Sequence, residues 1–193
     1  MKNGDTINFM SGILSVSAYD RENKLLWTDK SHNLIVMSGY NAVAKALAGV
    51  PDMYISKVAV GTNGNPAQES DTHITDAVLI NIKSIEYPKP VTVRFYFEIG
   101  YDEAVGVNIR EFGLIINTGQ LFSRKVREVI EKTQYFRIVG MWDVNICDSE
   151  TPLTEDVEYN NDYNNDYPSD GSIGGESDIQ LSTNQLVFDA AGN

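Results

Sequence analysis

The chain of 193 residues contains only one cysteine, Cys147, and only two histidines, His32 and His73. A single cysteine excludes an internal disulfide framework and a cysteine-rich metal site. The histidines are 41 positions apart and fit no HExxH pattern, so we expect them at the surface or in turns and assign no metal site. Cys147 ends an apolar run, which is typical of a partly buried, unreactive thiol. The fold must therefore be stabilised by packing.

Long apolar runs are also missing. No stretch of about 18 apolar residues occurs, so we expect no membrane insertion. The first residues, MKNGDTINFMSG, lack the apolar run of about 7–15 residues that a secretory signal needs, which favours assembly inside a cell. The GxSxG and GxGxxG motifs are absent, and GTNG at residues 61–64 has no lysine at P-loop spacing, so a turn explains it better. We therefore assign no catalytic and no cofactor-binding residue.

Positive charge is missing from the C-terminal part of the chain. Residues 150–193 hold 10 acidic side chains and no lysine or arginine, whereas residues 1–149 hold 17 acidic and 15 basic ones. The chain is thus a nearly neutral body followed by an extended acidic C-terminal tail. Because nucleic acid binding requires a basic face, we expect neither nucleic acid nor an anionic membrane surface as a partner.

The pattern that is present is a two-residue alternation, which is typical of half-buried strands. In VTVRFYFEI, residues 91–99, it places five apolar side chains on one face: Val91, Val93, Phe95, Phe97 and Ile99. Further strands are predicted at residues 13–18, 24–28, 33–37, 54–60, 77–87 and 133–146. The first three form an N-terminal meander, and Gly140 is a bulge or bend in the last. Eight to ten strands predict a mainly β body over residues 1–148, an antiparallel β-sandwich or barrel-like domain.

One short α-helix is predicted over residues 38–48. Ser38 can cap its first turn, and Gly49 followed by Pro51 ends it. Four apolar side chains fall on one face: Tyr40, Val43, Ala44 and Leu47. A helix of about three turns with one apolar face is expected to cover a face or an edge of the sheet.

The clearest local signal is NIREFGLIINTGQLFSRKV, residues 108–126. Two apolar runs flank residues 117–119, which predicts a β-hairpin whose glycine adopts a positive φ. Gly113 removes a side chain where another backbone or a ring can approach closely. Three polar side chains of the hairpin are expected to make subunit contacts: Arg110, Glu111 and Arg124. The polar loop before the hairpin, residues 61–76, is long for a compact domain and is either functional or mobile.

Residues 149–178 are an acidic, low-complexity linker by composition, with the sequence YNND occurring twice between residues 159 and 166. Three tyrosines there are expected to lie along a neighbouring subunit as further subunit contacts: Tyr159, Tyr163 and Tyr167. Glycan stacking by these rings is an alternative. Calcium binding is another, because Asp162, Asn164 and Asp166 match the first ligands of an EF-hand loop. That loop would need Gly at position 167 and Glu at position 173, where Tyr and Ile stand.

Four segments, read in order, resemble a domain of phage tail-fibre and baseplate-associated proteins. They are NLIVMSGYNAVAKALAG, ISKVAVGTNGNPAQESDTHI, IREFGLIINTGQLFSRKV and a strand ending in MWDVNI. Such proteins similarly show an Asn-containing strand that leads into a Gly-started helix, a strand that closes in Val-Gly-Thr, and a polar loop. An I-x-E-x-G-L strand then turns into an L-F-x-R strand. The resemblance covers residues 33–146, over half of the chain.

This resemblance implies a structural protein of the virion tail, assembled in the host cytoplasm, and not an enzyme. Such a protein would form a homo-oligomer, a trimer or a ring, and would dock to other tail or baseplate proteins to position host-attachment parts. The alternative is a carbohydrate-binding adhesin at a tail tip or a cell surface, with a host surface glycan as its partner. Four aromatic side chains could then stack on sugars: Tyr54, Tyr96, Tyr101 and Trp142.

The segment DIQLSTNQLVFDAAGN, residues 178–193, resembles the first strand of the BACON module, an immunoglobulin-like domain. Two interpretations stay open. Residues 179–193 either begin a further domain, or they form a terminal strand that is donated to the exposed sheet edge of a neighbour.

Overall fold

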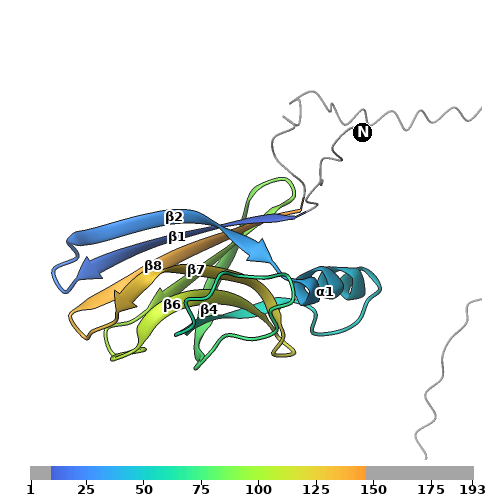
Figure 1. Cartoon of the computed structure of the whole chain (residues 1–193). Helices are drawn as coiled ribbons and strands as arrows, with labels where there is room; N and C mark the ends of the chain where they lie inside the picture. Colours follow the sequence, from blue (N-terminus) through green and yellow to red (C-terminus); the bar gives the residue numbers. More distant parts are fainter. Residues whose placement is uncertain (1–9, 147–193) are drawn as a thin grey trace, which may run out of the picture. The chain divides into compact units, whose positions relative to one another are not determined.

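The computed structural model describes residues 10–146, in which eight strands and one helix follow one another (Figure 1). Their order is β1 (Ser11–Asp20), β2 (Leu25–Ile35), α1 (Met37–Leu47), β3 (Ile55–Gly61), β4 (Val78–Lys89), β5 (Thr92–Ile99), β6 (Asn108–Ile116), β7 (Leu121–Glu131) and β8 (Phe136–Asn145). The predicted mainly β body with one short helix is confirmed. The predictions for Cys147, the acidic linker, its three tyrosines and the terminal strand lie outside the described residues.

The eight strands form a closed antiparallel barrel in the order β1-β2-β7-β6-β3-β4-β5-β8. Two strands turn the corners between two sheets. β2 pairs with β1 over most of its length and with β7 only through Leu34 and Ile35. β4 pairs first with β3, through residues 78–81, and then with β5, through residues 82–89. The fold therefore has features of both predicted architectures. It consists of two sheets, as in a sandwich, and the shared strands β2 and β4 join these sheets into a closed barrel.

The core fills the inside of the barrel. β1, β5 and β8 bury about every second side chain, as the period of two predicts, whereas residues 111–116 of β6 and 121–124 of β7 are buried on both faces. Phe97, Phe112 and Trp142 are its largest apolar members. The indole Nε1 of Trp142 donates to Asn33 Oδ1 of β2 at 2.9 Å, which satisfies the one polar atom of this ring. Asn33 therefore ties β2 to the interior near the point where β2 turns toward β7.

The predicted N-terminal meander has one strand too many. Residues 24–28 and 33–37 belong to a single strand, β2, which pairs continuously with β1 from Leu25 to Asn33 apart from one irregularity near its start. The polar residues 29–32 interrupted the apolar pattern and suggested a break. Lys30 and His32 lie on the exposed face of this strand, whereas Asp29 and Ser31 lie on its face of intermediate burial.

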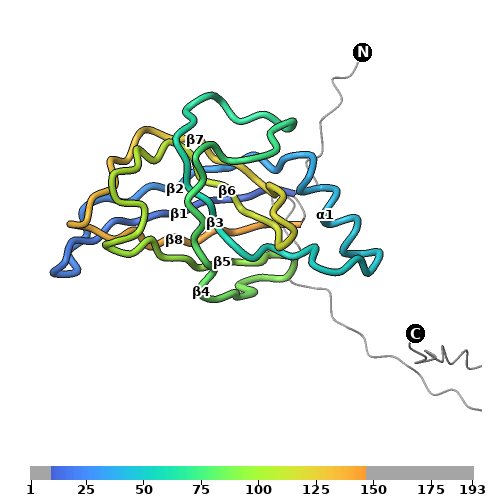
Figure 2. The backbone as a smooth tube through the Cα atoms, turned by 90° about the horizontal axis from the view of Figure 1, so that it is seen from below, coloured from blue at the N-terminus to red at the C-terminus, as the bar shows by residue number. Residues whose placement is uncertain are grey.

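Helix α1 lies at one end of the barrel (Figures 1 and 2) and begins differently from the prediction. Val36 is the N-cap residue, and no side chain caps the helix. Ser38 instead donates its hydroxyl to Leu121 O at 2.5 Å. The helix buries Gly39 and Ala42, while Leu47 is 85% exposed.

The apolar face of the helix was thus misplaced by the prediction, with Ala44 also exposed and Tyr40 and Val43 partly buried. The physical reason is a close approach between the helix and β7. A Cβ on Gly39 would lie 2.2 Å from Phe122 O, so glycine is required at the closest approach, while the larger Tyr40 and Val43 pack against the core only in part.

The hairpin between β6 and β7 forms as predicted, with Gly119 at a φ of 90°. The predicted bulge at Gly140 does not form, since the pairing of β8 with both β1 and β5 runs through this residue without a shift. A Cβ on Gly140 would instead lie 2.0 Å from Phe97 Cζ. The absent side chain therefore provides space for a core ring.

We expect Gly140→Ala to lower the free energy of unfolding by about 1–3 kcal/mol, because the added methyl group overpacks the core against Phe97. Chemical denaturation followed by tryptophan fluorescence measures this change. Gly64→Ala is the matched control, since its added Cβ would meet only the flexible side chain of Arg110 at 3.3 Å. Combining Gly140→Ala with Phe97→Leu should recover part of the loss. Equal stability of the two glycine variants would contradict this account.

Candidate functional site

The largest buried polar group lies on β6 and β7, where Glu111 and Arg124 pair across neighbouring strands. Arg124 Nε donates to Glu111 Oε2 at 2.7 Å, and the side chains are 2% and 0% exposed. The other carboxylate oxygen, Oε1, accepts from the backbone N–H groups of Thr75 at 2.8 Å and Asn63 at 3.1 Å. Glu111 therefore fixes both ends of the polar loop that joins β3 to β4.

Arg124 contacts the same loop with its remaining nitrogens. Nη1 donates to Asp71 Oδ2 at 2.8 Å, and Nη2 donates to Asn63 O at 3.2 Å. We call Glu111, Arg124 and Asp71 the clamp. Neither Glu111 nor Arg124 leaves a buried side-chain nitrogen or oxygen without a partner. The loop was predicted to be either functional or mobile, and the clamp shows that it is held to the barrel wall.

Two glycines make the close approach of this loop possible. A Cβ on Gly61 would lie 2.3 Å from Thr75 O, and a Cβ on Gly113 would lie 2.7 Å from Ile74 Cδ1. Ile74 is buried in a second small apolar cluster, formed with Val36, Ala59, Ile115 and Leu121. A close approach does occur at Gly113, but the predicted neighbour is wrong, because the aliphatic side chains of Ile74 and Leu121 make it and not a ring or a backbone.

The loop also completes the start of the helix. Its Glu69 O accepts from the backbone N–H of Met37 at 2.9 Å. This contact supplies one of the helix N–H groups with the partner that a capping side chain would otherwise provide. Burial raises the pKa of the neighbouring Tyr40, and the charge of Glu69 raises it further. The loop thus links the barrel wall to α1 (Figure 2).

The electrostatics of the clamp favour the charged state of its arginine. Burial by itself lowers the pKa of Arg124, but the hydrogen bonds and charges of Glu111 and Asp71 raise it by more, so the net pKa lies above its ordinary value. A buried ion pair with all its hydrogen bonds made is close to neutral for stability, whereas a buried charge that loses its partner is costly. The clamp therefore gives specificity to the loop position.

Of the three hairpin residues predicted to make subunit contacts, the structure buries two and leaves one exposed. Glu111 and Arg124 are wrong as surface contacts, because their polar atoms are buried and paired within one chain. Alternation along the strand correctly turned them away from the barrel interior, but the loop then covers them. Arg110 is exposed, so a subunit contact at this residue stays a prediction.

The aromatic residues considered for sugar stacking are mostly engaged inside the protein. Trp142 is 0% exposed and cannot contact a sugar. The hydroxyl of Tyr101 donates to Asp20 O at 2.8 Å, and the guanidinium of Arg21 lies 4.7 Å from its ring centre. Tyr96 is partly buried and donates to Glu86, while Tyr54 is 57% exposed. These residues do not form one stacking platform.

No sequence pattern pointed to Lys132, which is buried directly after the end of β7. Its Nζ donates to Thr133 O at 2.9 Å and to Tyr101 O at 3.2 Å, which joins the β5–β6 connection to the chain that leads into β8. Burial lowers the pKa of Lys132, and the charges of Glu103 and Asp102 offset part of this shift. Through these two hydrogen bonds, Lys132 holds the β5–β6 connection against the segment between β7 and β8.

Within residues 10–146, no group of three or more His, Cys, Asp or Glu side chains is placed to hold a metal ion. His32 and His73 are exposed, as predicted. Helix α1 is shorter and less apolar than a helix that crosses a membrane.

We expect Arg124→Met to lower the free energy of unfolding by about 3–5 kcal/mol, because it leaves the buried Glu111 carboxylate without its partner. Arg110→Met, on the same hairpin but exposed, should change it by less than about 0.5 kcal/mol. Urea denaturation of the purified chain measures both. If Arg124→Met does not fold, Arg124→Lys provides a milder loss of the same contacts. Equal effects of the two Arg→Met substitutions would show that the clamp does not stabilise the fold.

No protein-family model, no curated protein and no solved structure matches this chain significantly. The function must therefore be inferred from the geometry of its own residues.

Proposed function

We propose that the chain is a structural protein of a phage tail, associated with the tail fibre or the baseplate. It acts by self-assembly and by docking to other tail proteins, and so positions the parts that attach to the host. A β-barrel alone hosts many functions, so the fold does not carry this proposal.

One observation carries the proposal: three of the features that resemble tail proteins contribute residues to the clamp or to the loop that it holds. The Val-Gly-Thr turn contributes Gly61, the polar loop contributes Asp71, and the hairpin contributes Glu111, Gly113 and Arg124. These residues are far apart in the sequence, yet each either joins the clamp or makes space for the loop it holds. They act together as a device that fixes a surface loop, which is the work of a scaffold and needs no reactive group.

The proposal is tested in a phage that encodes this chain, by replacing residues 150–193 with a stop and quantifying the chain in purified virions by mass spectrometry. We expect the full chain in the virion and the truncated chain at a reduced level, because the acidic tail adds a second attachment to the particle. Circular dichroism of the purified truncated chain controls for folding of the body.

Absence of the full-length chain from purified virions would overturn the proposed function. Equal levels of the two forms would instead contradict the role of the tail and leave the virion assignment in place.

A further inference from the structure

The barrel is closed by only two residue pairs at one place, and it is open beside them. Leu34 and Ile35 of β2 pair with Arg124 and Ser123 of β7, and beyond these pairs the two strands separate. β2 continues for nine residues, from Leu25 to Asn33, paired with β1 on one side only. β7 likewise continues to Glu131 with β6 as its only neighbour, but this pairing is irregular, since Val126 and Ile130 have β6 partners and residues 127–129 have none. We call this opening between β2 and β7 the seam.

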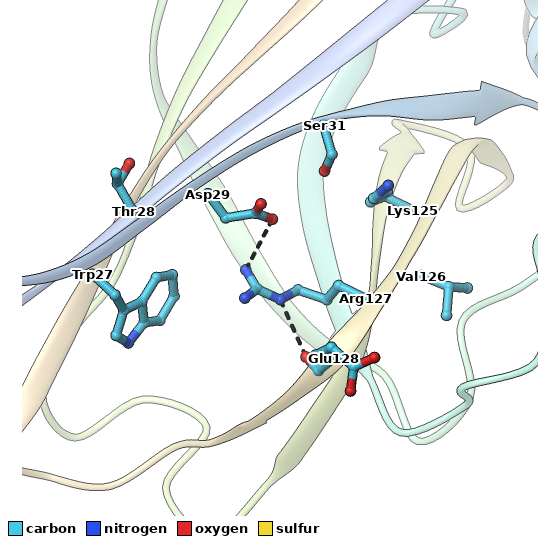
Figure 3. A pocket seen from close by; sticks show the side chains of 8 residues that line it. All are labelled: Trp27, Thr28, Asp29, Ser31, Lys125, Val126, Arg127 and Glu128. Carbon is cyan, nitrogen blue, oxygen red and sulfur yellow. Dashed lines mark hydrogen bonds and ion pairs between the residues drawn. The ribbon is translucent and has the colours of Figure 1, made fainter.

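The seam is a groove of about 420 Å³, lined by residues of both strands that include Trp27, Asp29, Ser31, Lys125 and Arg127 (Figure 3). Side chains alone bridge it. The guanidinium of Arg127 crosses from β7 and lies 4.9 Å from the ring centre of Trp27. Its Nη1 is 3.5 Å from Asp29 Oδ2, an ion pair without the geometry of a hydrogen bond.

Two buried polar atoms in the seam lack hydrogen-bond partners among the described residues: Ser31 Oγ and Arg127 Nη1. Burial lowers the pKa of Arg127, and the charges of Asp29 and Glu128 offset only part of this shift. Buried polar atoms normally have partners, so unmet donors beside an unpaired strand edge point to an occupant that brings backbone carbonyl groups. An added β-strand is such an occupant.

The apolar surface at the open end of the seam agrees with an added strand. Leu25 and Leu26 of β2 are about half exposed, and Val129 of β7 is 38% exposed. Long, unpaired strand edges with apolar side chains favour pairing with another chain, and natural proteins usually shield them. The seam therefore has the backbone edge, the unmet donors and the apolar border of a strand acceptor.

The chain itself contains a segment of suitable chemistry. Residues 179–190, IQLSTNQLVFDA, are rich in strand-forming residues and carry a single charge, at Asp189. The 32 residues between this segment and Ile146 are long enough to reach a neighbouring molecule, about 30 Å even as a coil.

We propose that residues 179–190 of one copy add as a β-strand to the free edge of β2 in the seam of a second copy. The added strand covers Leu25 and Leu26 and supplies carbonyl groups to Ser31 and Arg127. Donation from each copy to the next builds a dimer or a ring without any new domain interface. This inference deepens the self-assembly part of the proposed function, but it is tested on the purified chain alone, so the two can fail separately.

Cysteine cross-linking between separate chains tests the position of the strand. All chains carry Cys147→Ser; the acceptor carries Ser31→Cys, and the donors carry Ser182→Cys or Asn184→Cys. The acceptor control carries Ser84→Cys on β4, an exposed strand at the opposite edge of the same sheet. After mixing under mild oxidation, we expect several-fold more mixed disulfide with Ser31→Cys than with Ser84→Cys, measured on non-reducing gels and located by mass spectrometry. Equal cross-linking of the two acceptors, or none, would overturn the proposal.

The dependence of assembly on the segment is tested with the full chain in which residues 179–190 are shuffled, so that length, composition and charge stay constant. Light scattering after size-exclusion chromatography should give an oligomer for the original chain and a monomer for the shuffled one. The same mass for both chains, whether oligomer or monomer, would contradict strand donation.

Discussion

The buried pair of Glu111 and Arg124 is the constraint on which the rest of this structure depends. One carboxylate receives an arginine from the next strand and two backbone N–H groups from the two ends of a loop. A carboxylate is stable at 0% exposure only when its charge and its lone pairs are matched in this way. The glycines at positions 61 and 113, the buried Ile74 and the backbone contact to the start of α1 all follow from holding the loop against the barrel.

Strands β1, β5 and β8 could be predicted from the sequence because they are half buried, so that residue types alternate along them. The hairpin at residues 117–119 could be predicted for a related reason, since a positive φ demands glycine locally. What alternation cannot reveal is which strands are neighbours. β2 was divided in two because its polar middle resembles a turn, and only its pairing with β1 shows that the strand continues.

The predictions for Glu111, Arg124 and the helix face were wrong because they took no account of packing against the outside of the barrel. The loop between β3 and β4 and helix α1 both lie against β7 or its neighbour β6. Glu111 and Arg124 do point away from the barrel interior, as their positions in the strands predict. The sequence does not say that residues 62–77 fold back over them. The helix buries Gly39 and Ala42 because Phe122 O is too close for any larger side chain, so packing overrides the face that hydrophobicity selects.

The same two-sheet construction explains why one side of the barrel is open. A strand that serves two sheets must leave one partner before it joins the other, and β2 makes this exchange within two residue pairs. The loop clamp lies immediately next to this point, since Arg124 both holds the loop and pairs with Leu34. Beyond Val126, β7 leaves its regular pairing with β6 at residues 127–129, and no residue of β7 beyond Arg124 pairs with β2. The residue that holds the loop is thus also the residue at which the barrel closes, and the seam begins directly beyond it.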